Sequence, residues 1–412
     1  MSATTDLLET IRGSESGLTL AELLGRHPSI ARRTAQRLIA KLIESGHITA
    51  QGEGRARRYH ADSESHTEPR IAKVDSFPAF IPLSADSLDI LAYIDQPLPA
   101  RKPVGYQHDF LQAYHPNETC YLSESLRRQL HNMGKTTDID EPAGTYSRAI
   151  LNRLLIDLSW ASSHLEGNTY SRLDTRELIE HGKAARGKGA IETQMILNHK
   201  TAIELLVENI DSAEFNRYTL MNLHSALAEN LLPNPADEGR IRQHAVDISK
   251  SIYRPLSTAQ QIEEVLDEVL SKANQIHDPF EQSFFMMVHL PYLQPFADIN
   301  KRTSRLAANL PLFRGNLCPL TFLDVPEQAY SRATLGVYEM ARIELLRDLY
   351  VWAYERSTQE YLAIKRDLAE PDPLRLAWRD LIKQTVRGVV TSIQLDPLST
   401  IEQAVSENVP QQ

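Results

Sequence analysis

Apolar residues recur at three- and four-residue spacing along most of the chain, which is typical of amphipathic helices. This pattern predicts helices over residues 4–12, 19–28 and 29–46, and again over residues 218–232 and 262–275. Residues 47–62 instead form two β-rich arms around Gly52 and Gly54, which predicts a short hairpin. A further strand signal is confined to residues 240–256. We therefore expect a mainly α-helical protein.

The first sixty residues have the helix-end signals of a small domain. Thr19 and Ser29 are suited to cap the second and third helices, and Gly46 is suited to end the third. The same segment is basic, with seven Lys and Arg residues against two acidic ones between Ser29 and Arg58. The apolar positions expected to face inward are Ile30, Leu38, Leu42 and Ile43.

Three helices followed by a hairpin resemble a winged helix-turn-helix, in which the third helix enters the DNA major groove and the wing contacts phosphates. This resemblance implies a DNA-binding face made by Arg32, Arg33, Arg37, Arg55, Arg57 and Arg58. A small protein-interaction module whose arginines are only solvated remains the alternative.

Composition limits the class of protein. The chain has 412 residues, of which 42 % are hydrophobic and 24 % charged, as in an ordinary globular protein of two or three domains. Its net charge of -10 argues against a nucleic-acid coat protein. We find neither an apolar run of membrane-spanning length nor a signal peptide, so we expect a cytoplasmic protein without a membrane partner. Cys120 and Cys318 are expected to be reduced structural residues.

The stretch from Leu293 to Leu310, LQPFADINKRTSRLAANL, has the pattern of a phosphate site. A loop that runs directly into a helix directs free backbone N–H groups and the positive end of the helix dipole at an anion. Arg302 and Arg305 lie three positions apart and can both contact phosphate oxygens. Asp298 is suited to hold Mg²⁺ bridging a di- or triphosphate.

This stretch resembles the signature of the Fic family, H-P-F-x-D-G-N-G-R-x-x-R, at Pro295, Phe296, Asp298, Asn300, Arg302 and Arg305. The resemblance implies ATP or another nucleoside triphosphate, with Mg²⁺ on Asp298, the α-phosphate on Asn300 and the outer phosphates on Lys301, Arg302 and Arg305. Phe296 is also expected to belong to the nucleotide site.

Two other segments support the resemblance. SSHLEGN is similar to the family's inhibitory helix motif, with Ser162, Glu166 and Gly167 in register, and implies that Glu166 pairs with Arg305. Residues 238–256 resemble the family's flap, a short antiparallel pair that docks a target peptide by strand addition, with Arg242, Val246 and Ile248 as docking residues.

Three positions depart from the signature. Gln294 replaces the histidine that acts as general base, and an amide cannot accept a proton at neutral pH. Ile299 replaces a glycine and would oppose a left-handed backbone. Lys301 replaces the second glycine, as in the Doc branch, where phosphotransfer replaces AMP transfer. His289 and His244 are not expected to substitute for the missing base.

The resemblance implies a Fic-type helical core over residues 146–356 with a small β-hairpin flap. We expect a winged helix-turn-helix over 1–62, a linker and helical extension over 63–145, and a helical tail over 357–412. Two functions stay open: an autoinhibited AMP- or phosphoryl-transferase acting on protein hydroxyls, and a catalytically silent, nucleotide-sensing transcriptional regulator. A third hypothesis is one component of a toxin–antitoxin pair. A homodimer is left open.

Overall fold

The computed structural model describes residues 3–14, 17–28, 30, 32–44, 48–52, 57–61, 76–136 and 141–368, with six isolated residues beyond (381, 384, 385, 398, 401 and 405). The chain divides into two compact units, Met1–Asp75 and Ser76–Gln412. Each has its own hydrophobic core. The finer four-part division expected from the sequence stays a prediction.

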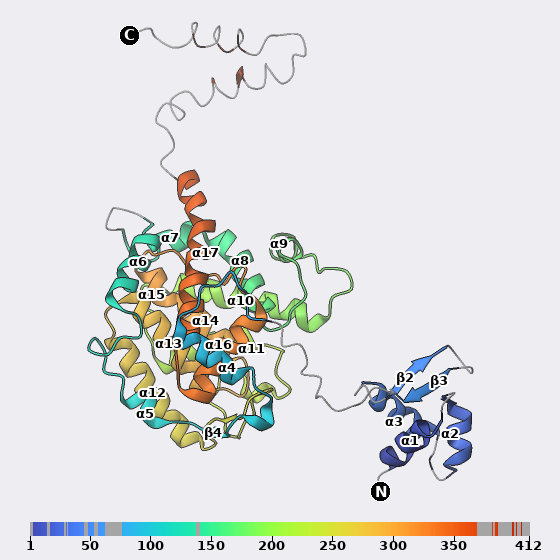
Figure 1. The fold of residues 1–412 in the computed structure, drawn as a ribbon. Coiled ribbons are helices and arrows are strands. Elements are labelled where there is room, and N and C mark those ends of the chain that lie inside the picture. The colour runs from blue at the N-terminus through green and yellow to red at the C-terminus, as the bar shows by residue number, and fades with distance from the viewer. Residues whose placement is uncertain are drawn as a thin grey trace. The chain divides into compact units, whose positions relative to one another are not determined.

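The described residues of the N-terminal unit form three helices and a small antiparallel sheet (Figure 1). Its strands occur in the spatial order β1-β3-β2. Thr19 caps α2 as predicted, in a reciprocal pair of bonds with Glu22. The expected cap Ser29 and the expected stop Gly46 lie outside the described residues. The elements are α1 (Ala3–Arg12), β1 (Leu18–Thr19), α2 (Leu20–Arg26), α3 (Arg32–Glu44), β2 (Ile48–Gln51) and β3 (Arg58–Ala61).

The predicted inward positions of this unit are confirmed. Leu42 is buried, and Ile30, Leu38 and Ile43 pack against the same core. Of the arginines proposed for DNA contact, Arg57 is exposed, whereas Arg58 is half-buried and donates to the Gly17 carbonyl at 2.8 Å. Arg55 and the side chains of Arg32, Arg33 and Arg37 lie outside the described part of the chain.

Where the structure describes it, the second unit is mainly helical, with two short strands. Its elements are α4 (Ala85–Ile94), η2 (Leu98–Ala100), β4 (Val104–Gly105), α5 (His108–Gln112), α6 (Glu124–Gly134), α7 (Thr145–Ala149), α8 (Leu151–His164), α9 (Arg172–His181), α10 (Ala190–Glu208), α11 (Arg217–Ala228), η3 (Pro235–Asp237), β5 (Tyr253–Arg254), α12 (Ala259–Gln275), α13 (Pro279–Leu293), α14 (Asn300–Ala307), α15 (Asn309–Arg314), α16 (Glu327–Met340) and α17 (Glu344–Leu368).

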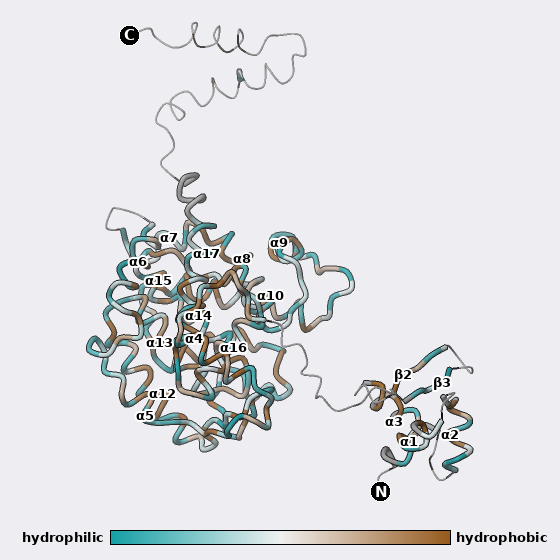
Figure 2. The backbone as a smooth tube through the Cα atoms, viewed as in Figure 1, coloured by the Kyte–Doolittle hydropathy of each residue, from teal (hydrophilic) through white to brown (hydrophobic). Residues whose placement is uncertain are grey.

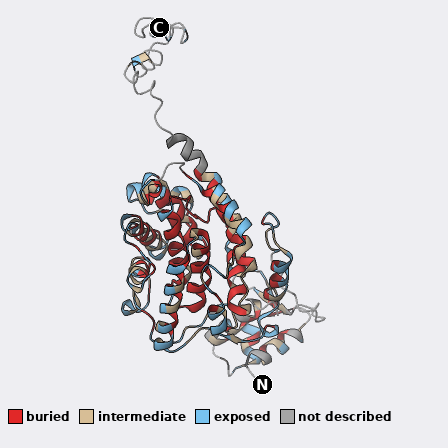
Figure 3. Cartoon of the chain, turned by 90° about the vertical axis from the view of Figure 1, so that its left-hand side faces the viewer, coloured by how far each residue is buried: buried red, intermediate tan, exposed pale blue. Residues whose placement is uncertain are grey.

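Helix α13 is the central element of this unit. Nearly every residue from Phe280 to Leu293 is buried, so the helix is enclosed on all sides, and α12, α14, α15 and α16 pack around it. Figure 3 shows buried residues concentrated on the inner helices and exposed ones on the periphery. Peripheral helices alternate hydrophobic and hydrophilic residues (Figure 2), and α11 and α12 confirm the two helices predicted from that alternation.

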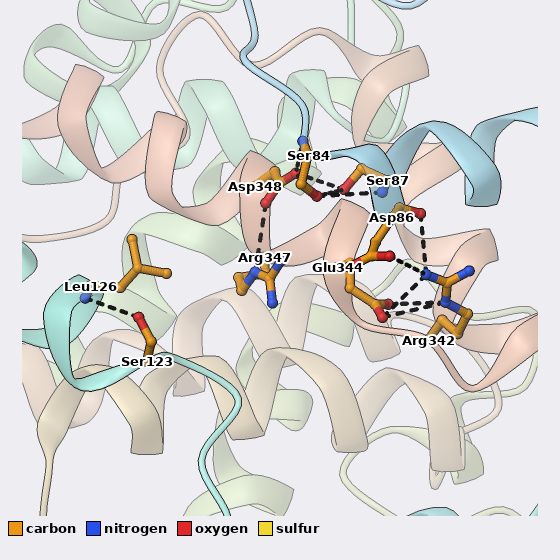
Figure 4. A network of polar contacts seen from close by, with 9 residues as sticks. All are labelled: Ser84, Asp86, Ser87, Ser123, Leu126, Arg342, Glu344, Arg347 and Asp348. Atoms are coloured by element: carbon orange, nitrogen blue, oxygen red, sulfur yellow. Dashed lines mark hydrogen bonds and ion pairs between the residues drawn. The ribbon is translucent and has the colours of Figure 1, made fainter.

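A polar network fixes α4 against α17 at the edge of the unit (Figure 4). One carboxylate oxygen of Asp348 accepts hydrogen bonds from the Ser84 backbone N–H, at 2.7 Å, and from the hydroxyls of Ser84 and Ser87. This carboxylate therefore joins the N-terminal end of α4 to a helix more than 250 positions later.

A membrane span requires a helix of sufficient length and apolar character. None of the helices of the described residues meets both requirements.

Residues 240–256 differ from the predicted antiparallel pair. Only Tyr253 and Arg254 form a strand, β5, and it pairs in parallel with β4. The guanidinium of Arg242 explains the difference, because it donates to the carbonyls of His244 and Leu256. A carbonyl bonded to this side chain is not free to extend a strand ladder, so the segment folds as a loop. Below, we call residues 240–252 the flap loop.

Candidate functional site

The loop between α13 and α14 begins and ends with a left-handed residue. Gln294 ends α13 with φ 53°, and Ile299 precedes α14 with φ 65°. Ile299 thus adopts the conformation that its β-branched side chain was expected to oppose, at a cost of about 1–2 kcal/mol. Its side chain is buried, and this burial offsets the strain. The first backbone N–H groups of α14 have no side-chain cap.

Asn300 holds this loop together from inside. Its side-chain amide donates to the Gln294 Oε1 atom and to the Phe296 carbonyl, both at 2.9 Å, and its Oδ1 accepts the Phe296 N–H. The residue is 3 % exposed. Asn300 was expected to bind the α-phosphate, but both its donors and its acceptor are used within the loop. Its role is to position the loop.

Phe296 was also expected at the nucleotide and lies elsewhere. The ring is fully buried and stacks on His224, with ring centroids 3.9 Å apart. The His224 Nδ1 atom accepts the Gly239 N–H, so Nε2 carries the proton and donates to the Asp298 carbonyl. Burial lowers the pKa of His224 to about 4, which keeps the ring neutral. Phe296 and His224 therefore support the loop from behind.

The side chain of Gln294 is fully engaged. Its amide nitrogen donates to the Pro291 carbonyl at 2.7 Å and to the Tyr338 hydroxyl at 3.1 Å, while its oxygen accepts from Asn300. Only a second lone pair on that oxygen stays free. The position of the missing base is thus occupied by an amide that is fixed in the loop.

A cavity of about 860 Å³ opens beside this loop. It brings together several of the predicted site residues, namely Glu166, Val246, Ile248, Gln294, Asp298 and Lys301. Tyr338 from α16 and Asp237, His244 and Asp247 from the segment before β5 also line it. Phe296, Asn300, Arg302 and Arg305 do not line the cavity.

Arg242 was expected to dock a target peptide, and the structure gives it a different role. It is 1 % exposed, and its guanidinium donates to the carbonyls of Gln294 at 2.7 Å, His244 at 2.8 Å and Leu256. Burial lowers the pKa of Arg242 to about 10. Because all three acceptors are main-chain carbonyls, Arg242 ties the flap loop to the α13–α14 loop and is not free to contact a partner.

Glu166 lies in the turn that follows α8 and reaches the α14 cations. Its Oε1 atom is 2.8 Å from Arg305 Nη2, and its Oε2 atom is 2.9 Å from Lys301 Nζ. Burial raises the pKa of this carboxyl, but the opposing effects of Arg305 and Lys301 bring it down to about 2. Gly167 follows with φ 84° and lets the chain turn away. Glu166 therefore occupies the cationic surface that Arg305 and Lys301 form.

Arg305 is held from the α8 side as well. Its Nε donates to the Ser162 hydroxyl and its Nη2 to the Ser162 carbonyl, both at 3.0 Å. Ser162 can in turn donate to His199 Nε2 at 2.9 Å, because His199 donates from Nδ1 to the Met195 carbonyl. Burial lowers the pKa of His199 to about 3, so this histidine stays neutral. Ser162 thus contacts Arg305 in addition to the Glu166–Arg305 pair that the resemblance implied.

Arg302 retains an unused donor. The residue is 7 % exposed, and its Nη1 atom is buried without a hydrogen-bond partner. Burial lowers the pKa of Arg302, with Glu166 and Asp298 acting in the opposite direction. A buried guanidinium nitrogen with no acceptor is unfavourable by about 1–3 kcal/mol, and an anion would remove that penalty.

Residues 214–312, which span α11 to α15 and the loop just described, match the model of the Fic/DOC family. This segment of the chain therefore has the sequence of a Fic/DOC domain. Protein adenylyltransferase fic-1 of Caenorhabditis elegans is 26 % identical over 204 residues, which cover 48 % of this chain and 39 % of the relative. Protein adenylyltransferase Fic of Nematostella vectensis is 26 % identical over 242 residues, covering 52 % of this chain and 56 % of the relative.

A Fic family protein from Desulfovibrio desulfuricans G20 has the same fold, with a TM-score of 0.50 at 18 % identity over 62 % of this chain and 79 % of that one. The chain spans only 39–56 % of the length of the two curated relatives above. The mainly helical, Fic-type core expected from the sequence is confirmed.

The chemistry of the Fic site suits a magnesium–phosphate complex. Asp298 is exposed at the cavity, and its Oδ1 accepts only the neighbouring Ile299 N–H. Within the described ranges, no three His, Cys, Asp or Glu side chains gather closely enough to hold a metal ion. Mg²⁺ commonly binds one or two carboxylates and completes its shell with phosphate and water. Asp298 fits that use and would hold the ion only together with a phosphorylated ligand.

Sequence reasoning missed the histidines and tyrosines that shape this site. His199, His224, Tyr330 and Tyr338 come from three helices, α10, α11 and α16, and Arg305 lies 5.0 Å from the Tyr330 ring centroid. His289, in contrast, is the core residue it was expected to be. It is 1 % exposed, and burial lowers its pKa to about 3. A single histidine in a helical pattern can lie in the core or at a site, and the sequence pattern does not distinguish the two.

Proposed function

We propose that this chain transfers AMP from a nucleoside triphosphate to a protein hydroxyl and that Glu166 restrains the reaction. The observation that supports this most is the ion-paired position of Glu166 between Arg305 and Lys301 at the edge of the cavity. The adenylyltransferase names of the relatives favour AMP as the transferred group.

The roles follow from charge and position. Asp298 holds Mg²⁺ with the phosphates, the first N–H groups of α14 face the anion, and Lys301, Arg302 and Arg305 neutralise the outer phosphates once Glu166 moves away. The triphosphate must displace Glu166 from two cations, so the restraint acts by competition for the same positive charge. Val246 and Ile248, half-buried at the cavity, are proposed to contact the target protein.

Incubation with Mg²⁺ and α-labelled ATP tests this function. The chain carrying Glu166→Gly is expected to transfer label to protein, and the unmodified chain to transfer far less. Glu214→Gly is the matched control, because Glu214 is an exposed loop carboxylate outside the cavity. Parallel incubation with γ-labelled ATP separates AMP transfer from phosphoryl transfer. No labelled protein in any sample, with either nucleotide, contradicts the proposal.

The fixed amide of Gln294 supports a second candidate function. A Fic core whose base position is occupied by this hydrogen-bonded side chain can retain nucleotide binding without transfer. Three helices and an antiparallel sheet in the N-terminal unit suit a DNA-binding domain of the winged-helix kind. Under this proposal the chain senses a nucleotide and regulates transcription.

Fluorescence anisotropy with labelled genomic DNA fragments tests the second function. Affinity is expected to fall steeply with salt, because phosphate contacts release counterions, and to change when ATP and Mg²⁺ are added. Replacing Arg32, Arg33 and Arg37 together by Ala is expected to abolish binding. The nucleotide effect is expected to vanish in Arg305→Ala, which leaves the N-terminal unit intact. Equal DNA affinity with and without ATP contradicts the coupling.

A further inference from the structure

If AMP transfer occurs, the cavity needs a proton acceptor other than Gln294. Both hydrogens of its amide are donated, to Pro291 and Tyr338, and its oxygen accepts from Asn300. Neutral amides do not take up protons near pH 7. The target hydroxyl must nevertheless lose a proton as it attacks phosphorus.

The other titratable groups that face the cavity can be compared one by one. They are Glu166, Asp237, His244, Asp247, Asp298, Lys301 and Tyr338. Glu166 is neutralised by two cations, and Asp298 is proposed for Mg²⁺. Burial holds the pKa of Tyr338 well above 10, and Lys301 is a cation paired with Glu166.

Asp237 belongs to η3 and accepts from the Asn234 amide at 3.2 Å. His244 and Asp247 remain, both exposed on the flap loop. Imidazole is the stronger candidate, because its ordinary pKa lies nearest neutrality and proton transfer is most efficient when the pKa of the base is close to the working pH.

Arg242 holds the main chain of His244 beside that of Gln294. One planar guanidinium donates from Nε to the Gln294 carbonyl at 2.7 Å and from Nη1 to the His244 carbonyl at 2.8 Å. The two main chains therefore lie side by side although they are fifty positions apart. With its carbonyl fixed in this way, His244 leaves its imidazole exposed at the same cavity that Gln294 lines.

We propose that His244 is the proton acceptor of this chain, in place of the side chain at position 294. The inference rests on the proposed transferase function. The target hydroxyl oxygen forms a bond to the α-phosphorus while the bond from that phosphorus to the pyrophosphate oxygen breaks. The hydroxyl proton passes to a ring nitrogen of His244, and pyrophosphate leaves with the electron pair.

The test compares variants in the Glu166→Gly background, using Mg²⁺, α-labelled ATP and the proteins of a cell lysate as acceptors. Adding His244→Asn is expected to reduce the rate of label transfer by about 10²- to 10⁴-fold, the usual contribution of a general base. The affinity for ATP, measured by calorimetry, is expected to stay unchanged. His277→Asn is the matched control, because His277 is an exposed histidine that does not line the cavity.

A pH profile gives an independent readout. The rate in the Glu166→Gly background is expected to rise with pH as an imidazole loses its proton, and this rise is expected to be absent from the His244→Asn variant. Asp247→Asn tests the neighbouring carboxylate. A large loss in Asp247→Asn together with an unchanged rate in His244→Asn overturns the assignment.

Two further outcomes separate this inference from the proposed function. Transfer in the Glu166→Gly background that persists within tenfold in His244→Asn rejects His244 and leaves the transferase function standing. Transfer that occurs only after Gln294→His is added also rejects His244, because the cavity is then competent but lacked a base. No transfer and no ATP binding in any variant removes both proposals.

Discussion

Glu166 and Arg305, which are 139 positions apart, meet at 2.8 Å between Oε1 and Nη2. The guanidinium is 1 % exposed, so its charge has little access to water. Removing one member of such a pair typically costs 3–5 kcal/mol, because the other charge is left buried. A phosphate that replaces Glu166 would supply the missing negative charge. Arg305 would then keep an ionic partner after Glu166 has moved away.

Lys301 provides the weaker half of this restraint. Its ammonium contacts Glu166 at 2.9 Å, but the Lys301 side chain is 35 % exposed, so the pair should contribute only about 0.2–1 kcal/mol. We expect Lys301→Ala to change the free energy of unfolding by no more than that. We expect it to raise label transfer far less than Glu166→Gly does. Denaturant titration and the ATP-labelling assay check both points. An increase in label transfer as large as that of Glu166→Gly would assign the restraint to Lys301.

Stability is expected to depend on the protonation of Glu166. Its pKa is lowered from 4.5 to about 2, so folding favours the charged form. The resulting stabilisation, roughly 3 kcal/mol at 1.36 kcal/mol per pKa unit, is fully present above about pH 4.5 and is lost as the pH falls through 2. The difference in unfolding free energy between the unmodified chain and Glu166→Gln should shrink over this range. A difference that is constant from pH 5 to pH 2.5 contradicts the ion pair.

Ile299 allows backbone strain to be measured apart from side-chain burial. Replacing it by Ala removes a buried side chain, at a cost of about 2–5 kcal/mol, and keeps the left-handed strain. Replacing it by Gly also removes the side chain but relieves strain of about 1 kcal/mol. We therefore expect both variants to be destabilised, with Gly at least as stable as Ala. If Ile299→Gly is less stable than Ile299→Ala, as is usual elsewhere, the backbone at position 299 is not left-handed.

Arg242 is expected to determine how firmly the flap loop is held. Lysine at this position keeps the charge, but its ammonium cannot donate to the three carbonyls that the planar guanidinium reaches. Each buried carbonyl left without a donor lowers the free energy of unfolding by about 1–3 kcal/mol. Arg242→Lys should therefore lower the midpoint of denaturation and expose the flap loop to limited proteolysis. Arg240→Lys is the control, because Arg240 is exposed. Equal cleavage of both variants would refute the anchoring role.

The sequence alone determined the helical class, the Thr19 cap and the order of the charged positions. Apolar periodicity predicted α11 and α12, and Thr19 was recognised as a cap from its place at the start of the second predicted helix. These features depend on residues a few positions apart, and such local relations are visible in a linear pattern. The resemblance to the family was visible for the same reason, because it rests on the fixed spacing of six positions between Pro295 and Arg305.

Only the tertiary structure decided which of these residues face the cavity. Phe296 and Asn300 belong to the same short stretch as Asp298 and Lys301, yet they do not line the cavity, because Phe296 stacks on His224 and Asn300 bonds to Gln294. Arg242 is buried because it lies against carbonyls of segments distant in the chain. Burial and hydrogen-bond partners are set by such distant neighbours, and no local pattern of hydrophobic and polar positions encodes them.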